Sequence, residues 1–189
     1  MQFGKRRFFR MKQNAKIGVL SSAKNVTLLA MMTALSVIIG IFCKNFLSFG
    51  SGLFRITFEN LPIILSGILF GPIAGGLVGV SSDLISYLLS SQIYPPNLIV
   101  TAGACAVGIV SGLVPRLIVR KKGTLQIAVS GALAHIVGSM IIKPIGLYQF
   151  YGILVLWRIP LYLLIAPIEI FILCAMLKRP SFCKLTGYL

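Results

Sequence analysis

A small set of charged residues in this chain lies in or beside apolar segments, where burying a charge costs free energy. Four of the eighteen basic residues stand apart from the basic clusters, beside or within apolar segments: Lys44, Arg55, Lys143 and Arg158. Ionisable residues in such segments usually face a bundle interior or a wet cavity and mark a functional site. Of the three carboxylates in the chain, only Glu59 and Asp83 are placed to balance these cations. A pocket built from this set would have surplus positive charge, which predicts an anionic ligand; Lys44 alone could instead extend to the lipid headgroups.

Asp83 and several polar or aromatic residues complete the candidate site. Asp83 lies in the middle of an apolar run, where it either pairs with a cation to join two helices or accepts hydrogen bonds from a bound heterocycle, and these roles are compatible. The other candidates are polar or aromatic residues: Phe58, Tyr94, Asn97, His135 and Trp157. His135 is either a packing residue or a ligand contact. The aromatic residues either form an interfacial belt or stack on a flat ring.

The elements that must position these residues are membrane-spanning helices. The chain has 189 residues, of which 57% are hydrophobic and 11% charged, too little charge for the surface of a soluble domain. The apolar residues form long runs, and a spanning helix needs about 20 such residues. The sequence therefore predicts an all-α membrane protein, a bundle of six transmembrane helices. The predicted helices cover about 24–46, 61–70, 73–89, 97–119, 124–142 and 153–177, with an aromatic loop at 148–151.

Basic clusters predict the orientation of this bundle. They lie in the tail 1–23, in the loop 116–122 and in the tail 179–189, and an even number of helices puts all three on one side. The positive-inside rule makes that side cytoplasmic, with 24–178 as the membrane domain. The basic N-terminus could also suggest a signal peptide, but no small-residue cleavage pattern follows the apolar run, which favours a retained first helix.

Several function classes are excluded by what the sequence lacks. It has no phosphate loop of the type GxxxxGK[ST], no metal-ligand cluster, no GxSxG elbow and no paired carboxylates. The net charge of +15 resides mostly at the ends of apolar runs, which indicates contact with the lipid bilayer rather than with nucleic acid. The four cysteines lack metal or redox spacing. These features favour a binding protein without metal or cofactor over an enzyme.

A family resemblance supports this interpretation. The order and spacing of several segments resemble the folate-family substrate-binding subunit (S component) of energy-coupling factor vitamin transporters, which are ABC-type importers. The segments are 55–62 (RITFENLP), 67–72 (GILFGP), 75–79 (GGLVG), 83–85 (DLI), 94–96 (YPP) and 158–160 (RIP).

The resemblance implies a function and a set of partners. S components of this family have six helices in the bacterial plasma membrane, bind a vitamin from outside, and dock on a coupling membrane subunit with two cytoplasmic ATPases that supply the energy. Ala30 and Ala34 match the AxxxA docking motif of the first helix. The implied cargo is folate or a reduced folate, with Arg55 as the first expected contact and Arg158 the next.

Departures from the family pattern leave the vitamin open. Asn97 follows the loop proline where family members often have Gly, and 101–104 matches the family segment only approximately. Riboflavin or pantothenate therefore remains an alternative cargo. A structural or regulatory membrane protein, in which the outer charges merely pair with one another, remains the alternative from a different class.

Overall fold

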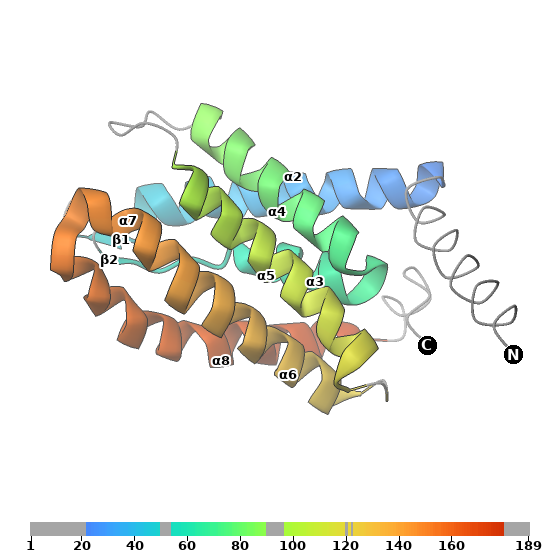
Figure 1. The fold of residues 1–189 in the computed structure, drawn as a ribbon. Helices are drawn as coiled ribbons and strands as arrows, with labels where there is room; N and C mark the ends of the chain where they lie inside the picture. Colours follow the sequence, from blue (N-terminus) through green and yellow to red (C-terminus); the bar gives the residue numbers. More distant parts are fainter. Residues whose placement is uncertain (1–21, 50–53, 90–96, 120, 122, 180–189) are drawn as a thin grey trace, which may run out of the picture.

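The computed structural model describes residues 22–49, 54–89, 97–119, 121 and 123–179. These residues form a bundle of helices with one pair of two-residue strands (Figure 1). In chain order the elements are α2 (Ala23–Phe46), β1 (Ser48–Phe49), β2 (Phe54–Arg55), α3 (Asn60–Phe70), α4 (Pro72–Leu89), α5 (Leu98–Leu117), α6 (Thr124–Ala134), the π-helix η1 (His135–Ile142), α7 (Lys143–Tyr151), the 3₁₀-helix η2 (Gly152–Trp157) and α8 (Arg158–Leu177).

Several of these helices suit a bilayer. In the described part of the chain, four helical stretches are long and apolar enough to span a membrane: α2, α4, α5 and the continuous stretch Thr124–Leu177. A straight helix of 54 residues would be about 80 Å long. The stretch instead reverses at Gly152, whose φ of 57° ends α7, and α8 returns along α6 (Figure 1). The chain is thus a helical membrane protein, as predicted.

The predicted loop at 148–151 is wrong, because these residues form the last turn of α7. The predicted fifth helix also continues well past its expected end near 142. Pro144 lies in the first turn of α7, directly after the π-helix η1. A proline lacks the N–H that an α-helix interior uses, and the wider π-helical turns let the chain pass this position without a break.

Small residues let α4 and α5 pack with their backbones in contact. A Cβ atom added to Gly108 would collide with the carbonyl oxygen of Gly75, and one added to Gly79 would collide with that of Ala104. Backbone contacts of this kind are typical of small-xxx-small patterns in membrane helices. The glycine pairs Gly75/Gly79 and Gly108/Gly112, each four residues apart, therefore lie where α4 and α5 pack against each other.

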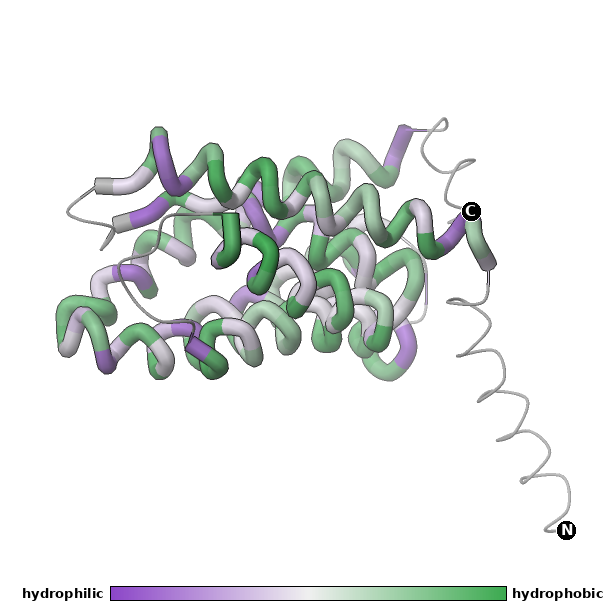
Figure 2. Tube along the Cα trace, turned by 90° about the horizontal axis from the view of Figure 1, so that it is seen from above, coloured by the Kyte–Doolittle hydropathy of each residue, from purple (hydrophilic) through white to green (hydrophobic). Residues whose placement is uncertain are grey.

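The short helix α3 forms the centre of the bundle. Residues 61–68 are all buried, and α3 contacts α2, α4, α5, α6 and α8. The outer surface, by contrast, exposes large apolar side chains such as Leu88, Leu164 and Phe171. Hydrophobic positions dominate along the helices, while hydrophilic ones gather toward their ends (Figure 2). This distribution suits a protein whose outer surface contacts lipid.

The strand pair holds one functional segment against the bundle. Ser48 pairs with Arg55 in the antiparallel register, and the Ile56 N–H donates to the Leu47 carbonyl oxygen at 3.1 Å. Arg55 is thereby held beside the end of α2, near the start of the buried helix α3.

Candidate binding site

A polar cavity of about 200 Å³ lies among α2, β2, α4, α5, α7 and α8. All four cations that stand apart in the sequence line it, and so do the two carboxylates expected to balance them. The charged lining residues are Lys44, Arg55, Glu59, Asp83, Lys143 and Arg158. Four positive and two negative groups leave a formal charge of +2 on the wall, so the cavity is suited to an anion.

Glu59 is the hub of the charged network. Arg55 Nη2 donates to Glu59 Oε2 at 2.8 Å and to the Gly40 carbonyl oxygen at 3.0 Å. Lys143 Nζ donates to Glu59 Oε1 at 3.3 Å. The backbone carbonyl of Glu59 accepts from Ser36 Oγ at 2.7 Å. One residue thus links α2, β2 and α7.

The ammonium group of Lys143 is also bound by the buried side-chain amide of Asn60. Its Nζ donates to Asn60 Oδ1 at 3.1 Å, and Asn60 Nδ2 donates to Ser139 Oγ at 3.3 Å. Asn60 and Ser139 are fully buried, and Lys143 is only 4% exposed. Buried polar groups need such partners to offset desolvation, and here they fix the ammonium at the cavity wall.

The Glu59 carboxyl group is held in its charged form. Burial acts to raise its pKa, but the positive charges of Arg55, Lys143 and Arg158 outweigh that effect and lower the pKa to about 2. Nearby opposite charges within a few ångströms stabilise a carboxylate in this way. Glu59 is therefore an anion at any physiological pH, and it compensates part of the positive charge of the site.

Asp83 is bound by a hydroxyl group on the neighbouring helix. Thr101 Oγ1 donates to Asp83 Oδ2 at 2.6 Å, joining α5 to α4. Both residues line the cavity. Because a hydroxyl is neutral, this hydrogen bond leaves the charge of the carboxylate in place. Asp83 can therefore also accept hydrogen bonds from a donor-rich ligand.

Asn97 shapes the cavity wall from the start of α5. Its Oδ1 accepts from the Ile99 N–H at 2.9 Å, which caps the helix, and its Nδ2 donates to the Gly146 carbonyl oxygen at 2.6 Å. Asparagine is a preferred helix N-cap. The second bond ties α5 to α7, so Asn97 contributes to the geometry of the cavity as well as to its lining.

Aromatic rings line the same cavity. The guanidinium of Arg158 lies over the ring of Tyr151, with Cζ 5.5 Å from the ring centroid. This distance allows a cation–π interaction. Tyr87, Phe150 and Tyr162 also line the cavity, which gives it flat apolar surfaces next to its charges.

The spacing of residues along a helix could have predicted some of these aromatic lining residues. Tyr87 is four residues after Asp83, and Tyr162 is four residues after Arg158, so each pair shares a helix face. Tyr151 is eight residues after Lys143, but the assignment of 148–151 to a loop hid this relationship. Thr101 gave no signal of its own, because a hydroxyl residue in an apolar helix is common.

Three predicted site residues do not line this cavity. Phe58 is partly buried in the segment before α3, and Trp157 is 63% exposed at the end of η2. His135 is fully buried, with Nε2 2.6 Å from Glu169 Oε2 on α8. The length of the π-helix η1, which begins at His135, lies between His135 and Lys143, which separates His135 from the charged site. Tyr94 lies outside the described residues.

The fold and the cavity together define a small helical membrane protein with a cationic binding site. In the described part of the chain, no group of His, Cys, Asp and Glu side chains could hold a metal ion. The family model for the ECF transporter, substrate-specific component, matches residues 24–185, and the chain belongs to this family. It is therefore a substrate-binding transport protein rather than an enzyme, in agreement with the resemblance seen in its sequence.

Known proteins that are similar to the chain include a named transporter and a solved structure. The folate transporter FolT of Clostridium novyi (strain NT) is 38% identical over 45 residues, which are 24% of this chain and 26% of that protein. The match thus spans about a quarter of this relative. A crystal structure of FolT bound with folic acid has a TM-score of 0.64 and 22% identity, and the match covers 85% of this chain and 95% of that one. At this identity the likeness establishes the shared fold.

Proposed function

We propose that the chain is the vitamin-binding subunit of an energy-coupling factor importer and that its cargo is folate or a reduced folate. The observation that carries this proposal is the cavity with four cations, two carboxylates and several aromatic rings. Folate combines a flat pterin that has hydrogen-bond donors with a glutamate tail that has two carboxylates. The tail suits Arg55, Lys143 and Arg158, and the donors of the pterin suit Asp83.

The comparisons support the same cargo. The similar fold is that of a protein solved with folic acid, and the similar segment belongs to a folate transporter. Because the first likeness is at low identity and the second is short, the arrangement of charges in this chain remains the main argument. Riboflavin lacks a carboxylate and pantothenate has only one. Neither vitamin can therefore pair with as many of the cations that line the cavity as folate can.

We further propose six membrane passes with both tails in the cytoplasm of a bacterial cell. The passes are α2, α3, α4, α5, the combined segment of α6, η1 and α7, and α8. The exposed cations Lys24, Arg116, Lys121, Lys178 and Arg179 lie at the ends of helices away from the cavity, which fits the positive-inside rule. The cavity then opens to the outside, where a vitamin would enter.

The outer face of α2 is suited to docking on a coupling subunit. Ala30 and Ala34 are both exposed and lie one turn apart, so they form a shallow strip on which another helix can pack closely. Large apolar residues flank the strip, with Met31 62% and Ile38 64% exposed. We assign the energy for transport to the two ATPases of that partner module.

Titration of the purified protein in detergent tests the cargo. Folate and 5-formyltetrahydrofolate would be compared with riboflavin and pantothenate, following heat or the fluorescence of Trp157, the one tryptophan in the chain. Tight binding of a folate with no response to the two controls is expected. Binding of a control vitamin would show that the cargo is not folate, but it would leave the assignment as a vitamin-binding subunit unchanged. No response to any of the four, in protein that unfolds cooperatively, would favour a structural role.

A further inference from the structure

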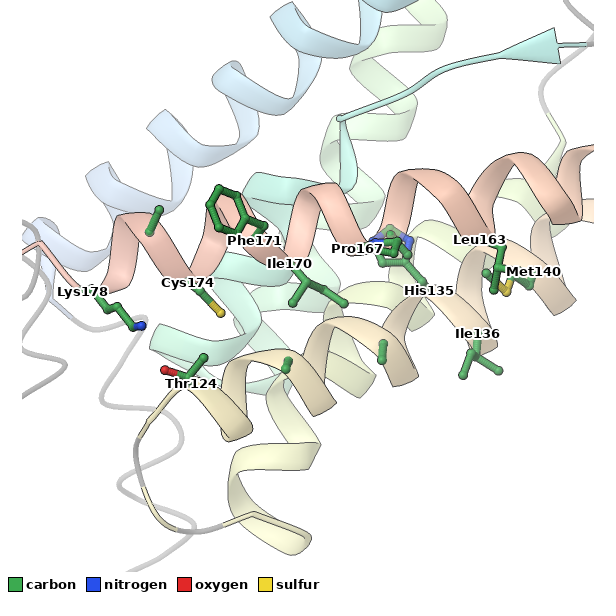
Figure 3. A pocket seen from close by; sticks show the side chains of 14 residues that line it. Thr124, His135, Ile136, Met140, Leu163, Pro167, Ile170, Phe171, Cys174 and Lys178 are labelled. Carbon is green, nitrogen blue, oxygen red and sulfur yellow. The ribbon is translucent and has the colours of Figure 1, made fainter.

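A second hollow lies on the outer surface, between α8 and the helix formed by α6 and η1. It has a volume of about 710 Å³, and its lining shares no residue with the candidate binding site. Figure 3 shows this groove, with side chains from α8 on one side and from α6 and η1 on the other. The groove is therefore a separate feature of the membrane-facing surface.

Small side chains open the groove along its length. Ala128 and Ala132 line it from α6, and Ala166 and Ala175 line it from α8. Larger apolar residues such as Phe171 form its rims, and that ring is 73% exposed. An apolar channel of this kind, facing the bilayer, is filled by something equally apolar.

The groove is long and narrow. Thr124 and Lys178 lie at one end, and Met140 and Leu163 lie at the other (Figure 3). Thr124 and Met140 are sixteen residues apart, which corresponds to about 24 Å along a helix. The hydrocarbon core of a bilayer is about 30 Å thick. One leaflet takes up about half of that thickness, so the groove is long enough to hold an acyl chain that enters at the Lys178 end.

Positive charge is concentrated at the end of the groove marked by Lys178. Lys178 lines the groove itself, and Lys121 and Arg179 are exposed in the adjoining segments. No carboxylate occurs among the lining residues. This end therefore complements an anionic headgroup.

The floor of the groove is formed by a buried contact between two polar side chains. His135 on η1 lines the groove, and its Nε2 lies 2.6 Å from Glu169 Oε2 on α8, with both side chains fully buried. The pair joins the two walls near the middle of the groove. The groove is thus maintained by contacts within the bundle and does not depend on an occupant to form.

We propose that this groove binds one acyl chain of an anionic phospholipid, with the lipid phosphate at Lys178 and Thr124. Charge complementarity decides for a lipid and against a second copy of the chain. Two copies inserted in the same direction would bring like basic ends together, and each chain has a formal charge of +15. Basic sites between membrane helices are known to select anionic headgroups.

The test uses the full-length protein without vitamin. The protein is equilibrated in mixed micelles of equal phosphatidylglycerol and phosphatidylcholine, and the lipids that remain bound are counted by native mass spectrometry. Lys178→Gln removes the cation at the groove, and its control is Lys24→Gln, an exposed cation at the start of α2 and outside the groove. Ala132→Trp fills the groove, and its control is Leu164→Trp, at a position on α8 that is 70% exposed and outside the lining.

We expect one retained phosphatidylglycerol in the unmodified protein. Lys178→Gln should reduce the preference for this lipid about fivefold, the effect of one cation near an anionic headgroup, and Ala132→Trp should remove retention of both lipids. Both controls should leave retention unchanged. Ala128→Leu is a milder filling variant if Ala132→Trp unfolds at a lower temperature than Leu164→Trp. Equal effects of Lys178→Gln and Lys24→Gln, or unchanged retention in both filling variants, would overturn the proposal. A dimer that Ala132→Trp dissociates would also overturn it.

Discussion

Lys143 Nζ lies 3.3 Å from Glu59 Oε1, although the two residues are 84 positions apart in the chain. The same carboxylate binds Arg55 through its other oxygen, at 2.8 Å. One anion thus holds two of the four cations of the cavity in place, one from the segment after the first helix and one from α7. The site is partly neutralised yet keeps surplus positive charge for a ligand.

Glu59→Gln should destabilise the protein, because it leaves Arg55 and Lys143 without their shared counter-charge. Breaking a fully buried ion pair costs about 3–5 kcal/mol. The Glu59 side chain is 21% exposed, so the expected loss is smaller, because water screens part of the charge. Thermal unfolding in detergent measures the effect. Adding Arg55→Ala to Glu59→Gln should recover part of the loss; a double variant less stable than either single variant would contradict the pairing.

The stability supplied by Glu59 should depend on pH in a defined direction. Its pKa is about 2 in the folded protein and ordinarily 4.5. A group with a lowered folded pKa stabilises fully above its unfolded pKa, and this contribution fades as pH falls toward the folded value. The difference in melting temperature between the unmodified protein and Glu59→Gln should therefore be constant above pH 5 and shrink from about pH 4.5 downward. A difference that grows with acidity would contradict the charged state assigned to Glu59.

Much of this fold could be predicted from the apolar runs alone. The first helix was expected at about 24–46 and is Ala23–Phe46, and the short second one was expected at 61–70 and is Asn60–Phe70. The failure at 148–151 has a physical cause. An aromatic loop was expected there, but the π-helix before Pro144 keeps the chain helical up to Gly152.

The candidate site was predictable in its charges but not in its neutral contacts. The cost of a cation near hydrocarbon singled out Lys143 and Arg158 regardless of fold. The bond from Thr101 to Asp83 depends on the register between α4 and α5, which spacing within one helix cannot give. His135 was ambiguous for the same reason, because its partner Glu169 lies on another helix.

Arg55→Ala should weaken binding of the proposed folate ligand by about 10- to 100-fold. A hydrogen bond to a charged group contributes about 1.5–3 kcal/mol, and Arg55 lines the cavity. The measurement is calorimetric titration with folate. Lys121→Ala, at an exposed cation outside the cavity, is the matched control and should bind as the unmodified protein does. Equal losses in both variants would point to a general charge effect rather than a contact.

Bulky residues on the outer face of α2 should separate binding from uptake. Ala30→Leu with Ala34→Leu would fill the shallow strip formed by these two exposed residues, so a partner helix could no longer approach closely. Folate binding by the purified variant should be unchanged, because neither residue lines the cavity. Uptake of labelled folate should be lost in cells that express the complete transporter.

The control for this experiment is Ala102→Leu, at an exposed alanine on α5. It makes the same change in size on a different face of the bundle, so it should leave both binding and uptake intact. Loss of uptake in the α2 double variant alone would place the partner module against α2. Normal uptake in that variant would move the docking surface to another face, and loss of uptake in both would indicate a general effect of bulk on the membrane-facing surface.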